Sequence, residues 1–166
     1  MNRTIRALTP EDEPFLWEML YQAIHVPEGQ AGPPRSVLQL PELAWYVEAW
    51  GRPGDCGFLA EIEETGPVGA AWIRLPPGGT RGYGYVADDI PELSMAVMPG
   101  FRGLGTGTAL LERLLASPCG AAPISLSVSA DNPAVRLYRR FGFETVSKAG
   151  GENGGSLTMR RSGMDR

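Results

Sequence analysis

Three glycines in the short stretch Arg102-Gly-Leu-Gly-Thr-Gly107 are spaced as in a loop that binds an anion. Because glycine has no side chain, a ligand can approach the main chain closely and the N–H groups stay unobstructed. A helix is expected to begin after the loop, and its first turn adds unpaired N–H donors and a partial positive charge. Arg102 supplies a full charge and several donors for phosphate oxygens. The stretch therefore predicts a phosphate-binding loop.

The spacing narrows the kind of phosphate ligand. A nucleoside-triphosphate loop needs a Gly-Lys-Ser/Thr run, and the sequence contains no Gly-Lys pair. A dinucleotide fingerprint needs a third glycine three residues after Gly105, and that position is Thr108. A plain glycine-rich connection before an amphipathic helix is the alternative that the loop alone leaves open.

Periodicity indicates a strand before the loop and a helix after it. Leu93, Met95 and Val97 alternate with polar or small residues, and Pro99 then ends the strand pairing because it has no N–H to donate. Beyond the loop, a set of leucines recurs at helical spacing until residues 117–118: Leu104, Leu110, Leu111, Leu114 and Leu115.

A second segment with chemical potential follows at residues 130–143. Asp131 or Asn132 can cap a helix whose first position is Pro133, and Gly142 suits its C-terminal end. Tyr138 lies within this helix and carries a phenol that can donate a proton.

Together the two segments resemble the GNAT superfamily of N-acetyltransferases. In that family a loop of the form Arg/Gln-x-x-Gly-x-Gly/Ala binds the pyrophosphate of acetyl-CoA, and Arg102, Gly105 and Gly107 stand at its fixed positions. Asn132 and Tyr138 match the family's second segment, which ends in Gly-Phe here as well, although its alanine stands one place early.

The resemblance implies acetyl-CoA as co-substrate. Where the strand parts from a parallel neighbour, its last residues are expected to present N–H groups that stabilise the thioester carbonyl. The residues expected to bind the cofactor are Ala96, Val97, Met98, Arg102, Gly103, Leu104, Gly105, Thr106, Gly107, Thr108 and Asn132.

The implied reaction needs a base and an acid. An amine must lose a proton before it attacks, and Glu92 is the candidate base, directly or through water, because it lies on the strand placed beside the thioester. Tyr138 is the candidate acid for the departing thiolate. Each residue has a plainer interpretation: Glu92 as a solvated carboxylate at a strand end, and Tyr138 as part of the apolar stripe of its helix.

Composition limits the class of protein. The chain has 166 residues, of which 43% are hydrophobic and 20% charged, with a formal net charge of −4. We expect one acetyltransferase-like domain over residues 1–166. The acidic balance argues against nucleic acid as a partner, and no apolar run approaches the roughly 20 residues of a membrane span. We therefore expect a cytoplasmic protein; the sequence is compatible with a homodimer.

Cys56 and Cys119 are the two cysteines of the chain. They are too few for a disulfide framework, and neither stands in a Cys/His spacing that binds a metal. We expect both to be reduced and structural, and we expect no metal site.

The order of elements predicts an α/β (α+β) fold: a mixed, mainly antiparallel sheet of six or seven strands with helices on both faces. The order β-α-α-β-β-β-α-β-α-β-β is similar to the GNAT arrangement. Strands are expected at 4–8, 56–63, 68–75, 92–97, 124–129, 143–148 and 156–160. A turn at 150–155 is expected to join the last two strands. Two early helices are expected at 9–24 and 40–50.

The sequence thus predicts an N-acetyltransferase that moves an acetyl group from acetyl-CoA to a primary amine of a small molecule or peptide. One alternative is a module that binds acyl-CoA as a sensor or regulatory subunit without turnover. Another is a nicotinamide-dependent oxidoreductase, which would need the missing third glycine. The sequence does not indicate which amine is acetylated.

Overall fold

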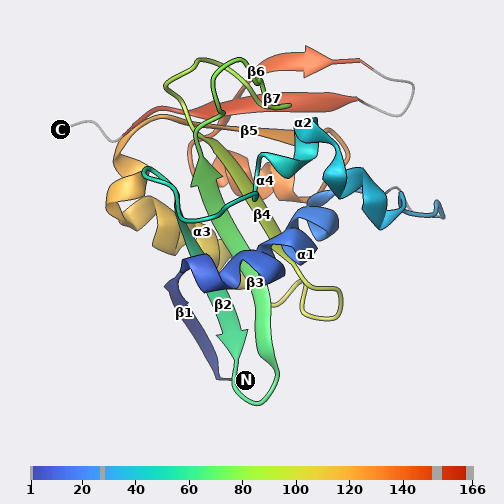
Figure 1. Cartoon of the computed structure of the whole chain (residues 1–166), viewed down its shortest axis with the longest axis vertical. Coiled ribbons are helices and arrows are strands. Elements are labelled where there is room, and N and C mark those ends of the chain that lie inside the picture. The colour runs from blue at the N-terminus through green and yellow to red at the C-terminus, as the bar shows by residue number, and fades with distance from the viewer. Residues whose placement is uncertain (1, 27–28, 151–154, 164–166) are drawn as a thin grey trace.

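Seven strands pair into one sheet (Figure 1). The computed structural model describes residues 2–26, 29–150 and 155–163. The spatial order is β1-β2-β3-β4-β5-β7-β6, and every neighbouring pair is antiparallel except β4 and β5. The strands are β1 (Arg3–Ala7), β2 (Cys56–Ile62), β3 (Gly66–Arg74), β4 (Glu92–Val97), β5 (Ile124–Ser129), β6 (Glu144–Ala149) and β7 (Ser156–Arg161).

Helices cover both faces of this sheet, as Figure 1 shows. One face carries α1 (Glu13–Ala23) and α2 (Pro41–Ala44), and the other carries α3 (Thr106–Ala116) and α4 (Ala134–Arg140). The short 3-10 helices are η1 (Pro10–Asp12), η2 (Arg35–Gln39) and η3 (Pro118–Ala121). The predicted fold class and order of elements are confirmed; the turn predicted at 150–155 lies mostly outside the described residues.

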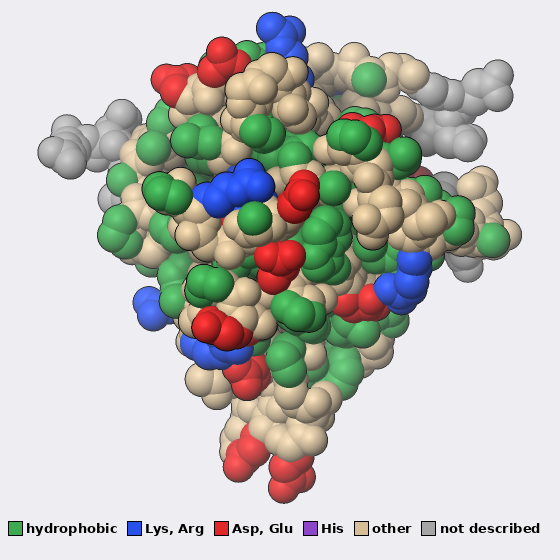
Figure 2. Space-filling view, in the orientation of Figure 1, with side chains coloured by type: hydrophobic (Ala, Val, Ile, Leu, Met, Phe, Trp, Pro, Cys, Tyr) green, Lys and Arg blue, Asp and Glu red, His purple; other side chains and the backbone are tan. Residues whose placement is uncertain are grey.

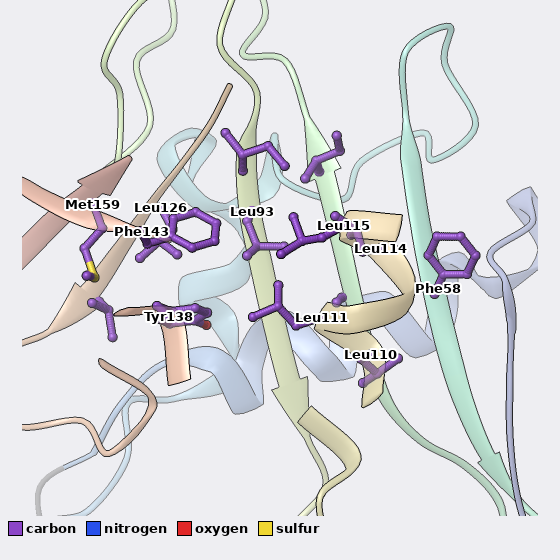
Figure 3. Packing of buried hydrophobic residues seen from close by; sticks show 14 of the residues in the cluster. Phe58, Leu93, Leu110, Leu111, Leu114, Leu115, Leu126, Tyr138, Phe143 and Met159 are labelled. Atoms are coloured by element: carbon purple, nitrogen blue, oxygen red, sulfur yellow. The ribbon is translucent and has the colours of Figure 1, made fainter. Parts of the chain in front are cut away.

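Two apolar layers hold the helices to the sheet. Leu110, Leu111 and Leu114 of α3 are fully buried against the sheet, as their helical spacing predicts (Figure 3). Leu104, expected in the same stripe, is 48% exposed because it lies in the loop before α3 begins. On the opposite face, α1 buries Leu16, Met19 and Leu20 in a second cluster with Trp72 and Ala96 of the sheet.

α2 is much shorter than the helix predicted over residues 40–50. It ends at Ala44, and residues 45–49 continue as turns. The guanidinium of Arg74 donates hydrogen bonds to main-chain carbonyls there, those of Trp45, Glu48 and Ala49, at 2.9, 2.6 and 3.3 Å. This satisfies from the side the carbonyls that a continuing helix would have bonded along its axis.

β4 and β5 pair at a single position. Glu92 lies opposite Ser125, whose N–H donates to the carbonyl of Pro91 at 3.0 Å. β4 stays paired with β3 up to Val97, whereas no further pair joins it to β5 in the part of the chain that the structure describes. The two parallel strands therefore part along most of β4 and leave one edge of β4 without a partner.

Cys56 and Cys119 correct the expectation of two reduced thiols. The structure joins them in a disulfide between the start of β2 and η3, with the Cα atoms 6.5 Å apart. Their 63-residue separation hides this proximity in the sequence. Among the helices described, none has the length and apolar character to span a membrane.

Reduction of this disulfide should destabilise the protein. A bond that closes a loop of this length removes conformational entropy from the unfolded chain, which typically stabilises a protein by about 2–4 kcal/mol. For a chain of this size that corresponds to a drop of roughly 5–15 °C in Tm. Thermal unfolding with and without reductant measures the drop, and the Cys119→Ser variant should show it without responding to reductant. An equal Tm for all four samples would contradict the prediction.

Candidate active site

The glycine loop and the first turn of α3 form a cradle of main-chain donors. In the described part of the chain, the N–H groups of residues 103–108 have no main-chain acceptor. Gly105 precedes α3 with φ at 82°, a left-handed conformation that favours glycine, and a Cβ there would meet open space. The unpaired N–H groups at a helix N-terminus fit the oxygens of a pyrophosphate.

Side chains from distant elements fix this cradle. Arg102 donates through Nε to the last carbonyl of β4 at 2.9 Å and through Nη2 to Oε1 of Gln22 at 3.3 Å. Arg3 donates from β1 to the carbonyl of Leu104 and to the hydroxyl of Thr106, at 3.2 Å each. The sequence analysis missed Gln22 and Arg3, since 80 and 101 residues separate them from their partners.

Only part of the expected strand donors faces the unpaired edge of β4. The Met98 N–H donates to the carbonyl of Val68 at 2.7 Å and so points to β3. Because N–H groups alternate in direction along a strand, Ala96 also faces β3, whereas Val97 and Met95 face the unpaired edge. The expectation that Ala96 and Met98 present their N–H groups to the thioester is therefore wrong. Of the expected residues, only Val97 has its N–H group at the unpaired edge of β4. Met95 also has its N–H group there, and the sequence analysis missed it.

Tyr138 projects from α4 into the layer between that helix and the sheet. Its ring packs edge-on against Phe143 with the centroids 5.7 Å apart, and the residue is 7% exposed. Figure 3 shows its hydroxyl end directed toward β4. Burial raises the pKa of Tyr138 to about 12, so the phenol holds its proton at neutral pH. Tyr138 is thus a core residue whose polar end lies on the side of β4.

Asn132 organises the start of α4. Its Oδ1 accepts from the N–H of Ala134 at 2.9 Å, and its carbonyl accepts from the N–H of Val135 at 3.1 Å. These bonds occupy the acceptor groups of Asn132 at the helix start, as a capping residue does. Its contact with a cofactor stays a prediction.

Glu92 begins β4 on the face that α1 and α2 cover. The residue is 1% exposed, and its Oε1 accepts from the Tyr46 hydroxyl at 2.7 Å and the Gly84 N–H at 2.8 Å. Oε2 has no hydrogen-bond partner among the described residues. Burial raises the pKa of Glu92, and the two hydrogen bonds act in the opposite direction. Glu92 is therefore not the solvated strand-end carboxylate that the sequence also allowed.

A strap of residues 82–84, which we call the glycine strap, covers Glu92. A Cβ at Gly82 would overlap Oε2 of Glu92 and press on the Trp45 ring, and one at Gly84 would lie 2.5 Å from the main chain of Leu126. Side chains at these two positions would have to displace the strap. The strap therefore closes the carboxylate from the solvent.

Tyr46 links the strap to the carboxylate, and the sequence analysis missed it. Its hydroxyl donates to Glu92 and accepts from the N–H of Tyr83 at 3.1 Å. Burial, and next the neighbouring Glu92, raise the pKa of Tyr46, which keeps the hydroxyl protonated as a donor. No motif marks this tyrosine, because 46 residues separate it from Glu92.

β4 brings these parts together. Glu92 stands at its start, and the cradle follows its end. Tyr138 approaches from α4, as Figure 3 shows. The unpaired edge of β4 runs between the carboxylate and the cradle. A donor cradle, a buried carboxylate on one face of β4 and a buried phenol on the other are groups that can serve proton transfer around an extended phosphate-bearing molecule.

Comparison with known proteins agrees with this geometry. The sequence matches the acetyltransferase (GNAT) family over residues 17–143, which is most of the chain. The chain belongs to this family. The match includes the glycine loop, Glu92 and Tyr138 and confirms the family resemblance drawn from the two motifs.

Relatives within the family differ in length. An L-2,4-diaminobutyric acid acetyltransferase of Nocardia farcinica is 40% identical over 116 residues, which cover 60% of this chain and 59% of the relative. A mycothiol acetyltransferase of an Arthrobacter species is 32% identical over 150 residues, covering 86% of this chain and 42% of the relative. The chain thus spans about half the length of these curated relatives.

A solved structure shows the same fold. It is a GNAT superfamily phosphinothricin acetyltransferase of Sinorhizobium meliloti in complex with acetyl-CoA. It superposes with a TM-score of 0.63 at 20% identity, covering 98% of this chain and 89% of that one.

Gly105→Ala should weaken acetyl-CoA binding, because a methyl group at a left-handed position strains the cradle and enters the space in front of its N–H groups. The expected loss is at least tenfold, or about 1.4 kcal/mol. Calorimetric titration with acetyl-CoA measures it. Gly54→Ala is the matched control: Gly54 has φ at 90° and its Cβ would also meet open space, but it lies before β2, away from the cradle. Both variants should lose similar stability, and equal affinities for acetyl-CoA would remove the cradle from the site.

Proposed function

We propose that this protein is an N-acetyltransferase, which transfers an acetyl group from acetyl-CoA to a primary amine of a small molecule or peptide. The observation that carries the proposal is the arrangement along β4. A phosphate cradle lies at one end of an unpaired strand edge, and a buried carboxylate lies at the other. Membership in the acetyltransferase family supports the same chemistry.

The cradle would hold the pyrophosphate through the N–H groups of residues 103–108, with Arg102 beside it. The N–H groups of Met95 and Val97 face the open edge and would donate to the carbonyl oxygen that gains charge in the reaction. Acetyl-CoA supplies an activated acyl group as a thioester. The protein supplies position and proton transfer.

Glu92 is proposed as the base that removes a proton from the attacking amine. Its raised pKa strengthens it as a base relative to an exposed carboxylate, and its Oε2 has an acceptor site left over after Tyr46 and Gly84 bind Oε1. The glycine strap must move aside for an amine to reach that oxygen. Tyr138 is proposed as the acid that gives a proton to the leaving sulfur, since its phenol is protonated at neutral pH.

A non-catalytic acyl-CoA sensor is the second candidate that the site allows. The cradle alone would suffice for it, whereas catalysis also needs groups that transfer protons, and a buried carboxylate and a buried phenol on the two faces of β4 favour the enzyme. Free-thiol release from acetyl-CoA across a panel of amino acids, polyamines, aminoglycosides and peptides separates the two functions. If acetyl-CoA binds but none of the amines causes release of free thiol, the sensor is favoured.

We also propose a cytoplasmic location and no nucleic-acid or membrane partner. The net charge of −4 disfavours polyanionic partners, and the face in Figure 2 shows acidic and basic side chains scattered without a continuous basic patch. The disulfide is an observation against this location, because such bonds are rare in cytosolic proteins. Titration of the thiols in freshly isolated protein would show whether Cys56 and Cys119 are bonded in the cell. A homodimer is a further proposal, tested by the mass in solution.

Tyr138→Phe should lower kcat by roughly 10²-fold while acetyl-CoA affinity stays nearly constant. The substitution removes the hydroxyl and keeps the ring that packs against Phe143, so stability should change little. Steady-state kinetics with calorimetric binding and thermal unfolding measure the three quantities. Full activity of the variant would show that Tyr138 only packs.

The pH dependence of kcat/KM should report Glu92. The base works only when it is deprotonated, so the rate should fall as the pH drops through its raised pKa. Glu92→Gln should remove this acidic limb and lower turnover at neutral pH by roughly 10²-fold. Tyr46→Phe removes a hydrogen bond that lowers the pKa of Glu92, so the limb should move to higher pH.

Protonation of the amine substrate also lowers kcat/KM at low pH. This part of the pH profile should stay in both variants, because it is a property of the substrate. A wild-type profile in Glu92→Gln would exclude Glu92 as the base. An unshifted acidic limb in Tyr46→Phe would show that Tyr46 does not position or tune the carboxylate.

A further inference from the structure

A row of polar residues crosses the sheet beside the candidate base. Glu92 of β4 lies opposite Ser125 of β5, and Ser125 lies opposite Arg160 of β7. Residues paired across neighbouring strands point to the same face of a sheet. Their neighbours Leu93, Leu126 and Met159 belong to the apolar cluster on the α3 and α4 face, so the polar row points to the opposite face.

The row begins with two buried acceptors that have no partner. Ser125 is fully buried, and neither its Oγ nor Oε2 of Glu92 has a hydrogen-bond partner among the described residues. Leaving such groups unpaired in the interior destabilises the fold, and a charged group more than a neutral one. Two adjacent acceptors, one of them a carboxylate, suit the three N–H donors of a primary ammonium group.

The row continues with a cation. Arg160 is only partly buried, and its recorded side-chain bond is to the hydroxyl of Ser162 at 3.2 Å. The next residue, Arg161, points the other way and donates to the carbonyls of Phe141 and Gly120, so it serves the fold. Arg160 borders a hollow of about 330 Å³ that Arg161 and Val146 also line. Glu144 of β6, which lies opposite Arg160 in the strand register, lines it too, so an acceptor carboxylate has to bind Arg160 beside this acidic side chain.

We infer that Arg160 determines acceptor specificity by binding a carboxylate that the acceptor carries together with its amine. The inference rests on the proposed function and names its acceptor class: a small amino acid, in preference to a polyamine or a protein N-terminus. The ammonium group lies at Glu92 and Ser125, and the carboxylate meets the fork of donors on Arg160.

The dimensions of the sheet fit such a molecule. Neighbouring strands lie about 4.8 Å apart, so the Cα atoms of Glu92 and Arg160, two strands apart, are separated by roughly 10 Å. Both side chains point to the same face of the sheet, where a small acceptor would lie between them. The glycine strap lies over Glu92 and over the main chain of β5 at Leu126, so the acceptor enters as the strap is displaced.

Matched pairs of acceptors test the inference. Each pair differs only by the carboxylate: 2,4-diaminobutyrate against 1,3-diaminopropane, and lysine against 1,5-diaminopentane. In the wild type, kcat/KM should be at least about tenfold higher for the amino acid of at least one pair. Arg160→Gln should lose this preference, chiefly through KM, and leave the diamine rates nearly unchanged. Arg160→Lys should keep part of it, because the charge remains while the fork is lost.

Arg140→Gln is the matched control, since Arg140 is an exposed arginine at the end of α4, and it should change neither member of a pair. Calorimetric binding of the same compounds to the CoA-bound protein gives a readout that does not need turnover. If the protein proves to be a sensor, thiol release fails while this binding still reports on Arg160. The inference is overturned if the wild type turns over diamines as well as amino acids, if Arg160→Gln lowers both members of a pair equally, or if neither assay shows a carboxylate preference.

Discussion

A buried ion pair holds together the face of the molecule that α1 and α2 cover. Arg74 is 2% exposed and donates to both carboxylate oxygens of Asp55, at 2.9 and 2.7 Å. The same guanidinium binds the main-chain carbonyls of residues 45, 48 and 49. Removing one partner of such a pair typically costs about 3–5 kcal/mol, because the other charge is left buried. Arg74 thereby fixes the turn that carries Tyr46, and Tyr46 in turn fixes Glu92.

The same pair explains why the carboxylate of Glu92 has no cationic partner. Arg74 and Glu92 are neighbours in register on β3 and β4, and a free guanidinium there would bind the carboxylate and lower its pKa. Asp55 and three carbonyls occupy Arg74 instead. Glu92 is therefore left with two neutral donors on one oxygen, and burial dominates its pKa. The sheet places a cation beside the carboxylate, and the ion pair keeps that cation occupied.

Local patterns in the sequence were enough to predict most of the fold. β4 follows from alternation, β2 and β3 follow from apolar runs bounded by turn residues, and the glycine loop follows from residues that are adjacent in the chain. The parts that could not be predicted depend on distant pairing. The direction of the Met98 N–H depends on its register with Val68, and the early end of α2 depends on Arg74. The hydrogen bond between Tyr46 and Glu92 joins residues that are 46 positions apart, and the disulfide joins residues that are 63 positions apart. Nothing local in the sequence signals either contact.

The missing side chain at Gly82 links two positions of the chain in their evolution. Any Cβ there would overlap the carboxylate of Glu92. The strap can therefore stay closed only while residue 82 is glycine or while residue 92 has a shorter side chain than glutamate. Homologous sequences should therefore show these positions changing together, with larger residues at 82 accompanying the loss of glutamate at 92. Such covariation would separate homologues that keep a covered base from those that have moved proton transfer to another group.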